Sequence, residues 1–388
     1  MRNLISRRLG TRQGDRGAIG VLVAILIGAG VLFGMGAMVI DVGQLYQNRA
    51  ELQNGADAAA LAVAKSCAEG SCTPSIAAQY ADANASTLTG GTAYVDGVCG
   101  VNGNATVGLG TCVPSQSVVC AANPPTGTNY VDVETSTELP NGSHLLPPVF
   151  ARTLAGNGSY QGSTVYACAQ AEWGTPLTGN TAGITIGLCD WSEATSNGTS
   201  YAPAPPYPPN PASQPIIIDF HDPSGQESDS TCPSGPAGQT ASGNFGWTQG
   251  VKTNCTLTSA DFTYTAGSYT YGGIPGNKKG NSGAVACESE LSTAQSNQQV
   301  LYMPVYASYN GKGSNATYTL AGLAAFAITG YNFGNKVQAV DRITGQLPCS
   351  GTSVTCISGY FLKDLIPPGT VATLGGASLG VSVIKLTG

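Results

Sequence analysis

The chain has 388 residues, of which only 10% are charged, and its formal net charge is −6. This low, acidic charge argues against a nucleic-acid-binding protein, which needs a clustered basic surface. Twelve irregularly spaced cysteines and only two histidines argue against a zinc site, and we expect neither a metal nor a cofactor. An even cysteine count with abundant glycine is typical of an exported protein that contains disulfides.

Residues 18–40 form an apolar run of 23 positions without a charged side chain. As one helix this run would be about 34 Å long, which is enough to cross a hydrocarbon core of about 30 Å. It is too long for a cleaved signal peptide, and no clean A-x-A site follows it. Five arginines and one aspartate precede the run, whereas 11 basic and 21 acidic residues follow it. The positive-inside rule therefore predicts a single-pass protein of the cell membrane, with residues 1–17 cytoplasmic and residues 41–388 outside.

Residues 41–90 are predicted to form an extracytoplasmic helical hairpin. Apolar positions keep helical spacing from Asp41 to about Ala64, so we expect the membrane helix to continue outward as a stalk, with Asp41 at the membrane exit. A second helix is predicted to follow residue 73. The alanine-rich stripe at 56–64 permits close helix contact, and we expect it to pack near Ala77 and Tyr80.

Two cysteine pairs flank short connections. Cys67 and Cys72 bracket the link between the two predicted helices, and Cys349 and Cys356 bracket a predicted turn. We expect a disulfide in each pair, while the connectivity of the other cysteines stays open.

The rest of the chain is predicted to be rich in β-strands and mainly antiparallel. Residues 91–174 are expected to form a membrane-proximal β layer, and residues 175–388 a β-rich ectodomain with an extended proline-rich loop at 202–215. No helical pattern longer than about ten residues interrupts the second region, which disfavours a parallel βαβ sheet. The whole is an α+β protein. The predicted strands are 117–121, 130–137, 149–154, 163–171, 184–189, 215–220, 261–271, 300–308, 317–331, 353–361 and 370–386.

One short segment has residues that could support catalysis. An apolar strand at 216–218 leads into Asp219, His221 and Asp222. We interpret it as a strand that ends in a polar turn, because neither a serine-hydrolase elbow nor a zinc-binding helix motif is present. We therefore expect no enzyme activity.

The segment of residues 16–66 resembles the N-terminal region of the Flp pilus-assembly TadE/TadG-like proteins. Its apolar span is followed by an Asp-x-Gly-x-x-Tyr element and an alanine-rich element, with Gly55 where alanine is commoner. The resemblance implies a membrane component of tight-adherence pilus machinery and, as partners, other pilus-assembly proteins or pilin subunits. The residues that carry it are Asp41, Gly43, Tyr46, Leu52, Gln53, Ala56, Asp57, Ala58, Ala59, Ala60, Leu61 and Ala62.

Three functions remain open. The first is a non-enzymatic anchor whose ectodomain contacts pilus subunits, the cell wall or a surface ligand. The second is a minor pilin cut after Gly14, Gly17 or Gly20, although Leu22 stands where general pilins carry glutamate after a cut at Gly17. The third is an anchored extracellular hydrolase, for which His221 would be the residue to test.

Overall fold

The computed structural model describes residues 16–28, 30–85, 91–103, 109–110, 112, 120, 128–150, 161–208, 214–221, 246–252, 254–273, 281–310, 317–334, 337–349, 355–366 and 371–387. The helices are α1 (Arg16–Gly28), α2 (Val31–Ala68), α3 (Ala77–Asn84), α5 (Leu188–Ala194) and α6 (Asn281–Asn297), with 3-10 turns at Pro74–Ile76, Gln249–Lys252 and Ser259–Asp261. The strands are β1 (Thr92–Val101), β2 (Asn129–Glu138), β3 (Tyr166–Gly174), β4 (Pro176–Gly179), β5 (Thr181–Ala182), β6 (Ile186–Gly187), β7 (Ile216–His221), β8 (Thr256–Leu257), β9 (Thr263–Thr265), β10 (Ser268–Gly272), β11 (Val300–Asn310), β12 (Thr317–Asn332), β13 (Gln338–Ala339), β14 (Thr355–Leu362), β15 (Asp364–Ile366), β16 (Val371–Leu374) and β17 (Val381–Leu386).

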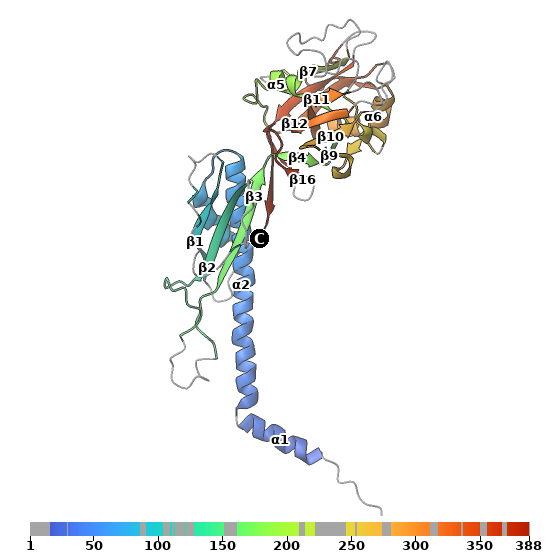
Figure 1. Ribbon diagram of the computed structural model, residues 1–388. Helices are drawn as coiled ribbons and strands as arrows, with labels where there is room; N and C mark the ends of the chain where they lie inside the picture. The colour runs from blue at the N-terminus through green and yellow to red at the C-terminus, as the bar shows by residue number, and fades with distance from the viewer. Residues whose placement is uncertain are drawn as a thin grey trace, which may run out of the picture.

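The apolar run at 18–40 is divided between two helices. The expectation of one uninterrupted helix is wrong at its middle, because Gly30 has a left-handed φ of 71° and separates α1 from α2. Glycine adopts this conformation without the cost that a Cβ would add, and glycines on both sides lower the helix propensity further. In Figure 1, α1 turns away from the axis of α2 below this break. Among the described residues, no helix is both long enough and apolar enough to cross a membrane.

Helices α2 and α3 form the predicted hairpin. The helix is continuous from Val31 to Ala68, so it is unbroken across the region where the stalk was expected. The contact face of α3 consists of Ala77 and Ala81, while Tyr80 is 45% exposed. The stripe therefore packs against the small side chains of α3, with Ala77 in the contact as expected, whereas Tyr80 is not part of this core.

A five-stranded sheet lies against α2 over the upper part of the helix (Figure 1). Its order is β1-β2-β3-β17-β15, antiparallel except for the parallel pair β15–β17. Successive side chains of each strand point to opposite faces of the sheet. Val131, Val133 and Ala169 are therefore fully buried in a core shared with α2. Asp132 and Gln170 lie on the opposite face. This sheet takes its strands from both expected regions, since β17 pairs with β3.

A second sheet forms the other end of the molecule in Figure 1. Its central strand β12 pairs with β11 on one side and with β14 on the other, both antiparallel. One face of this sheet packs on α6 through a core that includes Leu291 and Phe326. The other face buries an aromatic cluster with Tyr271 and Tyr318, whose rings stack at 5.3 Å.

Several expectations about residues 175–388 are wrong. The strand expected at 261–271 is a hairpin of β9 and β10, and the strand expected at 370–386 is divided into β16 and β17. Helix α6 has 17 residues, although no helix longer than about ten was expected. Its pattern is weak because serine, asparagine and glycine occupy many of its positions. The strand expected at 184–189 is limited to β6, and α5 begins at Leu188. The antiparallel architecture is nevertheless as expected, with β6–β11 as a second parallel pair.

The proline-rich segment is described only for residues 202–208 and 214–215. Ala202 forms a parallel bridge with Leu362, and Tyr207 is buried against the ring of Tyr360 at 4.6 Å. The segment is a loop at the surface, as expected, since Pro203, Ala204, Pro206 and Pro208 are exposed, and Tyr207 fixes it to β14. Residues 209–213 lie outside the described part.

Candidate functional site

The alanine-rich half of the family motif belongs to the core. Leu52, Ala56, Ala59 and Ala60 are all fully buried against α3 and the five-stranded sheet. The Leu52 carbonyl accepts a hydrogen bond from the Thr135 hydroxyl at 3.3 Å. Small side chains let the helix backbone approach both neighbours, which explains their pattern. These positions hold the fold together, and they offer no surface to a partner.

Gln53 and Asp57 connect α2 to the sheet. The Gln53 amide nitrogen donates to the Asp57 carboxylate and to the Cys168 carbonyl, each at 2.8 Å. One helical turn separates the two side chains, so the carboxylate orients the amide that reaches β3. Ala58, Leu61 and Ala62 are half-buried at the edges of this contact.

Asp41 binds a loop of its own chain. Its Oδ1 accepts hydrogen bonds from the backbone N–H groups of Val149 at 2.9 Å and Phe150 at 3.1 Å. A carboxylate held by two N–H groups makes charge-assisted bonds, which are stronger than neutral ones. This contact could not be predicted from the sequence, because the partners lie 108 and 109 positions away. Asp41 therefore fixes the loop after β2 to α2, about one third of the way along the helix.

Gly43 and Tyr46 have a different environment. Tyr46 is 72% exposed, and a Cβ on Gly43 would meet no heavy atom of the described chain within 4 Å. The packing of the described residues explains neither of these two motif positions. Both are exposed on α2, although their neighbour Leu45 packs against the core of the helices and the sheet.

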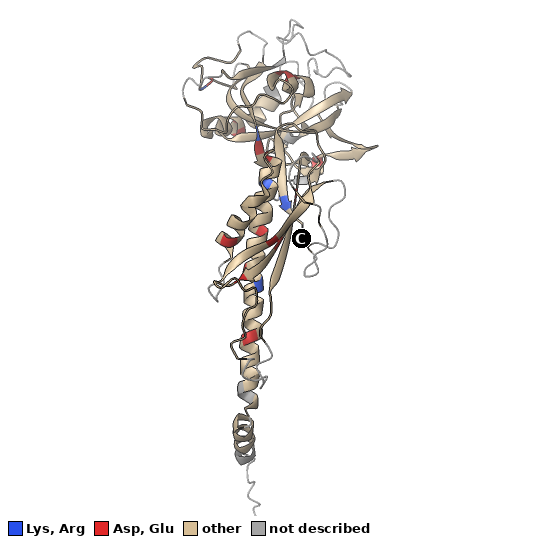
Figure 2. Cartoon of the chain, turned by 90° about the vertical axis from the view of Figure 1, so that its left-hand side faces the viewer, with Lys and Arg blue, Asp and Glu red and all other residues tan. Residues whose placement is uncertain are grey.

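The apolar surface continues down the helix from these positions. Val42 is 44% exposed, Ile40 49% and Val39 71%. Figure 2 shows that the charged residues of the described helix lie from Asp41 upward, beside the sheet, and that none lies on its lower part. The chain thus presents an uncharged, apolar helix on one side of Asp41 and an acidic unit on the other.

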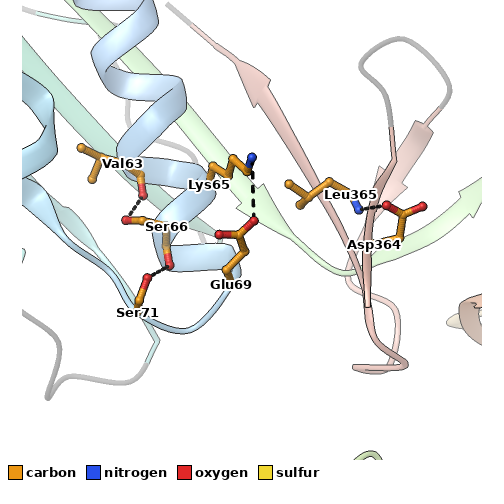
Figure 3. A network of polar contacts seen from close by, with 7 residues as sticks. All are labelled: Val63, Lys65, Ser66, Glu69, Ser71, Asp364 and Leu365. Atoms are coloured by element: carbon orange, nitrogen blue, oxygen red, sulfur yellow. Dashed lines mark hydrogen bonds and ion pairs between the residues drawn. The ribbon is translucent and has the colours of Figure 1, made fainter. Parts of the chain in front are cut away.

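The hairpin turn is closed by a disulfide and a serine network. Cys67 is bonded to Cys72 with a Cα–Cα distance of 3.6 Å. The Ser66 hydroxyl accepts from the Thr73 N–H at 2.8 Å and donates to the Val63 carbonyl at 2.9 Å. Figure 3 shows this end of α2 with the ion pair Lys65–Glu69, beside the segment of β15 that carries Asp364. The helix itself ends in a Schellman motif, in which Gly70 has a left-handed φ of 90°, its N–H donates to the Cys67 carbonyl, and the Ser71 N–H donates to the Ser66 carbonyl.

The second predicted disulfide is also present. Cys349 is bonded to Cys356 with a Cα–Cα distance of 6.3 Å. Three further bonds join Cys99 to Cys112, Cys120 to Cys168, and Cys255 to Cys287, and Cys189 is bonded as well. Within the described residues no cysteine is free.

One group of side chains in the described residues has ligand atoms close enough together to hold a metal ion, but its chemistry does not suit one. Cys99, Cys112 and Asp132 bring their ligand atoms close together, but the two sulfur atoms are bonded to each other. A disulfide lacks the thiolate that binds zinc. Burial raises the pKa of Asp132, and a 2.8 Å hydrogen bond from Gln170 opposes that rise.

The segment considered for catalysis lies partly within the described residues. Residues 216–221 form β7, which pairs antiparallel with β14, and Asp222 lies outside the described residues. Elsewhere, the buried Asp341 accepts hydrogen bonds from Thr329 at 2.6 Å and from Ser358, together with two backbone N–H groups. All these donors come from the surrounding strands and turn, so this carboxylate closes a structural network.

Comparison with known proteins identifies the helical segment. The model of a family described as putative Flp pilus-assembly TadE/G-like matches residues 17–66, which agrees with the resemblance of its motif residues. No curated protein and no solved structure matches the chain. The match covers α1 and nearly all of α2, and it includes both the buried alanine stripe and the exposed positions Gly43 and Tyr46.

Proposed function

We propose that this chain is a non-enzymatic, membrane-anchored component of a tight-adherence (Flp/Tad) pilus assembly system. The match of a pilus-assembly family model to residues 17–66 is the observation that carries the proposal. In this account the apolar segment at 18–40 anchors the chain, α2 is the stalk, and the two sheets are extracytoplasmic. Its partners are other pilus-assembly proteins or pilin subunits, and the sheets are available to the cell wall or to surface ligands.

The two parts of α2 differ in their surroundings, and this difference supports a stalk that holds the sheets at a set distance from the membrane. Below Asp41 the described side chains are apolar and exposed, and above it the helix is bound to a sheet by core packing, by Gln53 and by the hairpin. A helix that is apolar all round is suited to a lipid or protein environment. Tyr46 lies just above the apolar part, where an amphipathic ring is favourable at a membrane interface. The disulfides suit an oxidising compartment.

Single cysteines test the orientation, because the native cysteines of the described chain are all disulfide-bonded. Without reduction, a membrane-impermeant maleimide should label Asn54→Cys, at an exposed position of α2, in intact cells. The matched variant Ser6→Cys should be labelled only after lysis. The reverse pattern, or labelling of both variants in intact cells, would refute the proposed topology.

The intact mass of the purified protein separates the anchor from a minor pilin. An anchor retains residues 1–17. Processing after Gly14, Gly17 or Gly20 would instead remove the residues up to and including that glycine. Recovery of the shortened form would replace the anchor function with the pilin function.

A further inference from the structure

The loop after β2 brings exposed apolar side chains to the level of Asp41 on α2. Residues 139–150 contain no lysine, arginine, aspartate or glutamate, and they end in the run 145–150, here called the apolar loop. In this loop Leu145 is 44% exposed, Val149 50% and Phe150 40%. Because the Asp41 carboxylate accepts the N–H groups of Val149 and Phe150, these two residues lie beside the helix at that level.

The helix is apolar at the same level. Ile40 and Val42, on either side of Asp41, are 49% and 44% exposed. The next charged residue up α2 is Arg49, which at 1.5 Å per residue lies about 12 Å further along the axis. The apolar loop and the helix therefore present their exposed apolar side chains around a single carboxylate. Exposed apolar side chains that gather in this way mark a contact with a membrane or with another protein.

The backbone of the apolar loop is prepared for a surrounding that contains little water. Two of its positions are prolines, which have no N–H group, and the other N–H groups all donate hydrogen bonds. The bonds run from Leu145 to Ser143 Oγ, from Leu146 to the Ser163 carbonyl, and from Val149 and Phe150 to Asp41. A backbone donor without a partner is costly in lipid. This loop can therefore approach lipid without leaving a donor unpaired.

The loop is also fixed to the body of the protein. Leu146 is only 5% exposed and belongs to the core shared by the helices and the five-stranded sheet. Its N–H donates to the Ser163 carbonyl at 3.0 Å, and its carbonyl accepts from the Ser163 N–H at 3.2 Å. The loop is thus held on one side by the core and on the other by Asp41, so its exposed side chains have a set position.

We propose that the apolar loop inserts Val149 and Phe150 into the outer interface of the bilayer, as a second membrane contact beside the anchor helix. The inference rests on the proposed function, because the anchor sets Asp41 at the membrane surface. An aromatic ring is favourable in the interface, and burial of apolar side chains there adds to the binding. The two N–H groups that bind Asp41 lower the cost of a carboxylate at this depth.

Lipid is favoured over a protein as the occupant of this surface. The exposed side chains of the apolar loop adjoin Ile40, which belongs to the apolar run that the proposed anchor places in the bilayer. A surface that continues a membrane segment meets the same solvent as that segment. Two contacts with the bilayer, one through the helix and one through the loop, would restrict the tilt of the stalk.

The test uses full-length protein in phosphatidylcholine nanodiscs, with and without bromine on the acyl chains near the headgroups. Bromine quenches a tryptophan that touches lipid. Phe150→Trp reports on the loop and Val39→Trp on the helix below Asp41. Tyr264→Trp, at a 62% exposed position of the second sheet, is the matched control. The native protein supplies the background, since its three tryptophans are all at most 6% exposed.

We expect Phe150→Trp and Val39→Trp to lose emission in the brominated nanodiscs and to emit at shorter wavelength than Tyr264→Trp, which should show no quenching above the background. Adding Asp41→Ala to Phe150→Trp should reduce the quenching, because the loop is then released from the helix. Asp57→Ala removes another carboxylate of α2 that does not bind the loop, and it should leave the quenching unchanged.

The outcomes separate this inference from the proposed function. Quenching of Val39→Trp without quenching of Phe150→Trp would overturn the inference, leave the anchor in place and assign the exposed patch to a protein partner. Absence of quenching in both variants would refute the anchor and the loop contact together. Quenching of Phe150→Trp that Asp41→Ala does not reduce would overturn the role of Asp41 in placing the loop.

Discussion

The Cβ position of Gly55 in α2 lies 2.7 Å from the carbonyl oxygen of Ala81 in α3. It is also 3.0 Å from the Cβ of Ala85, so an alanine at this position would push the two helices apart. Residue 55 is the position at which the resembling family more often has alanine. In this chain glycine is required there because α3 crosses directly over it.

Gly55→Ala should therefore destabilise the hairpin despite the higher helix propensity of alanine. Overpacking of this kind costs about 1–3 kcal/mol, more than the propensity gain of about 1 kcal/mol. The measurement is thermal unfolding followed by circular dichroism. Gly43→Ala is the matched control in the same helix, because a Cβ there would meet no heavy atom within 4 Å. It should leave stability unchanged or raise it, and equal losses in both variants would contradict the close contact.

Ala60→Glu tests the core between the helices and the sheet. Ala60 is fully buried, so the substitution forces a carboxylate into an apolar contact and should cost several kcal/mol. Asn54→Glu adds the same group at an exposed position of the same helix and should change stability by less than about 0.5 kcal/mol. Urea-induced unfolding measures both. A fully stable Ala60→Glu protein would show that the stripe does not pack as described.

Two disulfides are expected to differ in their contribution. Cys67 and Cys72 are 5 residues apart, so replacing both by serine should cost less than the roughly 3 kcal/mol of a 15-residue loop. Cys255 and Cys287 are 32 residues apart, and their loss should cost between about 3 and 4.7 kcal/mol. Melting of the two double-serine variants checks the order. The reverse order would mean that strain in the folded state outweighs loop length.

Asp132 should make the stability depend on pH. Burial raises its pKa, so the folded state binds the proton more tightly than the unfolded state does. The stabilising contribution is then fully present below the unfolded pKa, near 3.8, and is lost as the pH rises through the folded pKa. Asp132→Asn should melt at a higher temperature than the native protein at pH 7, with the difference shrinking towards pH 3. A difference that is constant with pH would show that charge burial is not the cause.

The sequence predicted the elements whose patterns are local. The helix after Asp41, the antiparallel strands near 300–331 and the disulfides of Cys67–Cys72 and Cys349–Cys356 follow from spacing and short loops. The break at Gly30 could have been suspected from the glycines around it, but apolarity was the stronger signal. Helix α6 was missed because its polar positions conceal its buried ones.

The distant contacts could not be predicted from one sequence. Asp41 is a motif residue, yet its partners Val149 and Phe150 are ordinary loop positions. The cavity of about 400 Å³ lined by Ile184, Cys255 and Leu291 combines segments from three parts of the chain, and none has a motif of its own. Periodicity reports which side chains face a core, but it does not report which core they share.

The last strand of the chain, β17, is a central strand of the five-stranded sheet, so this sheet cannot be completed before β17 is synthesised. Its neighbour β3 is made early in synthesis, and the Thr387 hydroxyl binds the Gln170 carbonyl across 217 positions of sequence. Until residues 381–386 emerge, the edge of β3 has unpaired backbone groups that invite pairing with another chain. Such long-range pairing also slows folding. The five-stranded sheet beside α2 is therefore completed only after the strands of the second sheet have been synthesised. A chain that stops before β17 would leave the edge of β3 exposed.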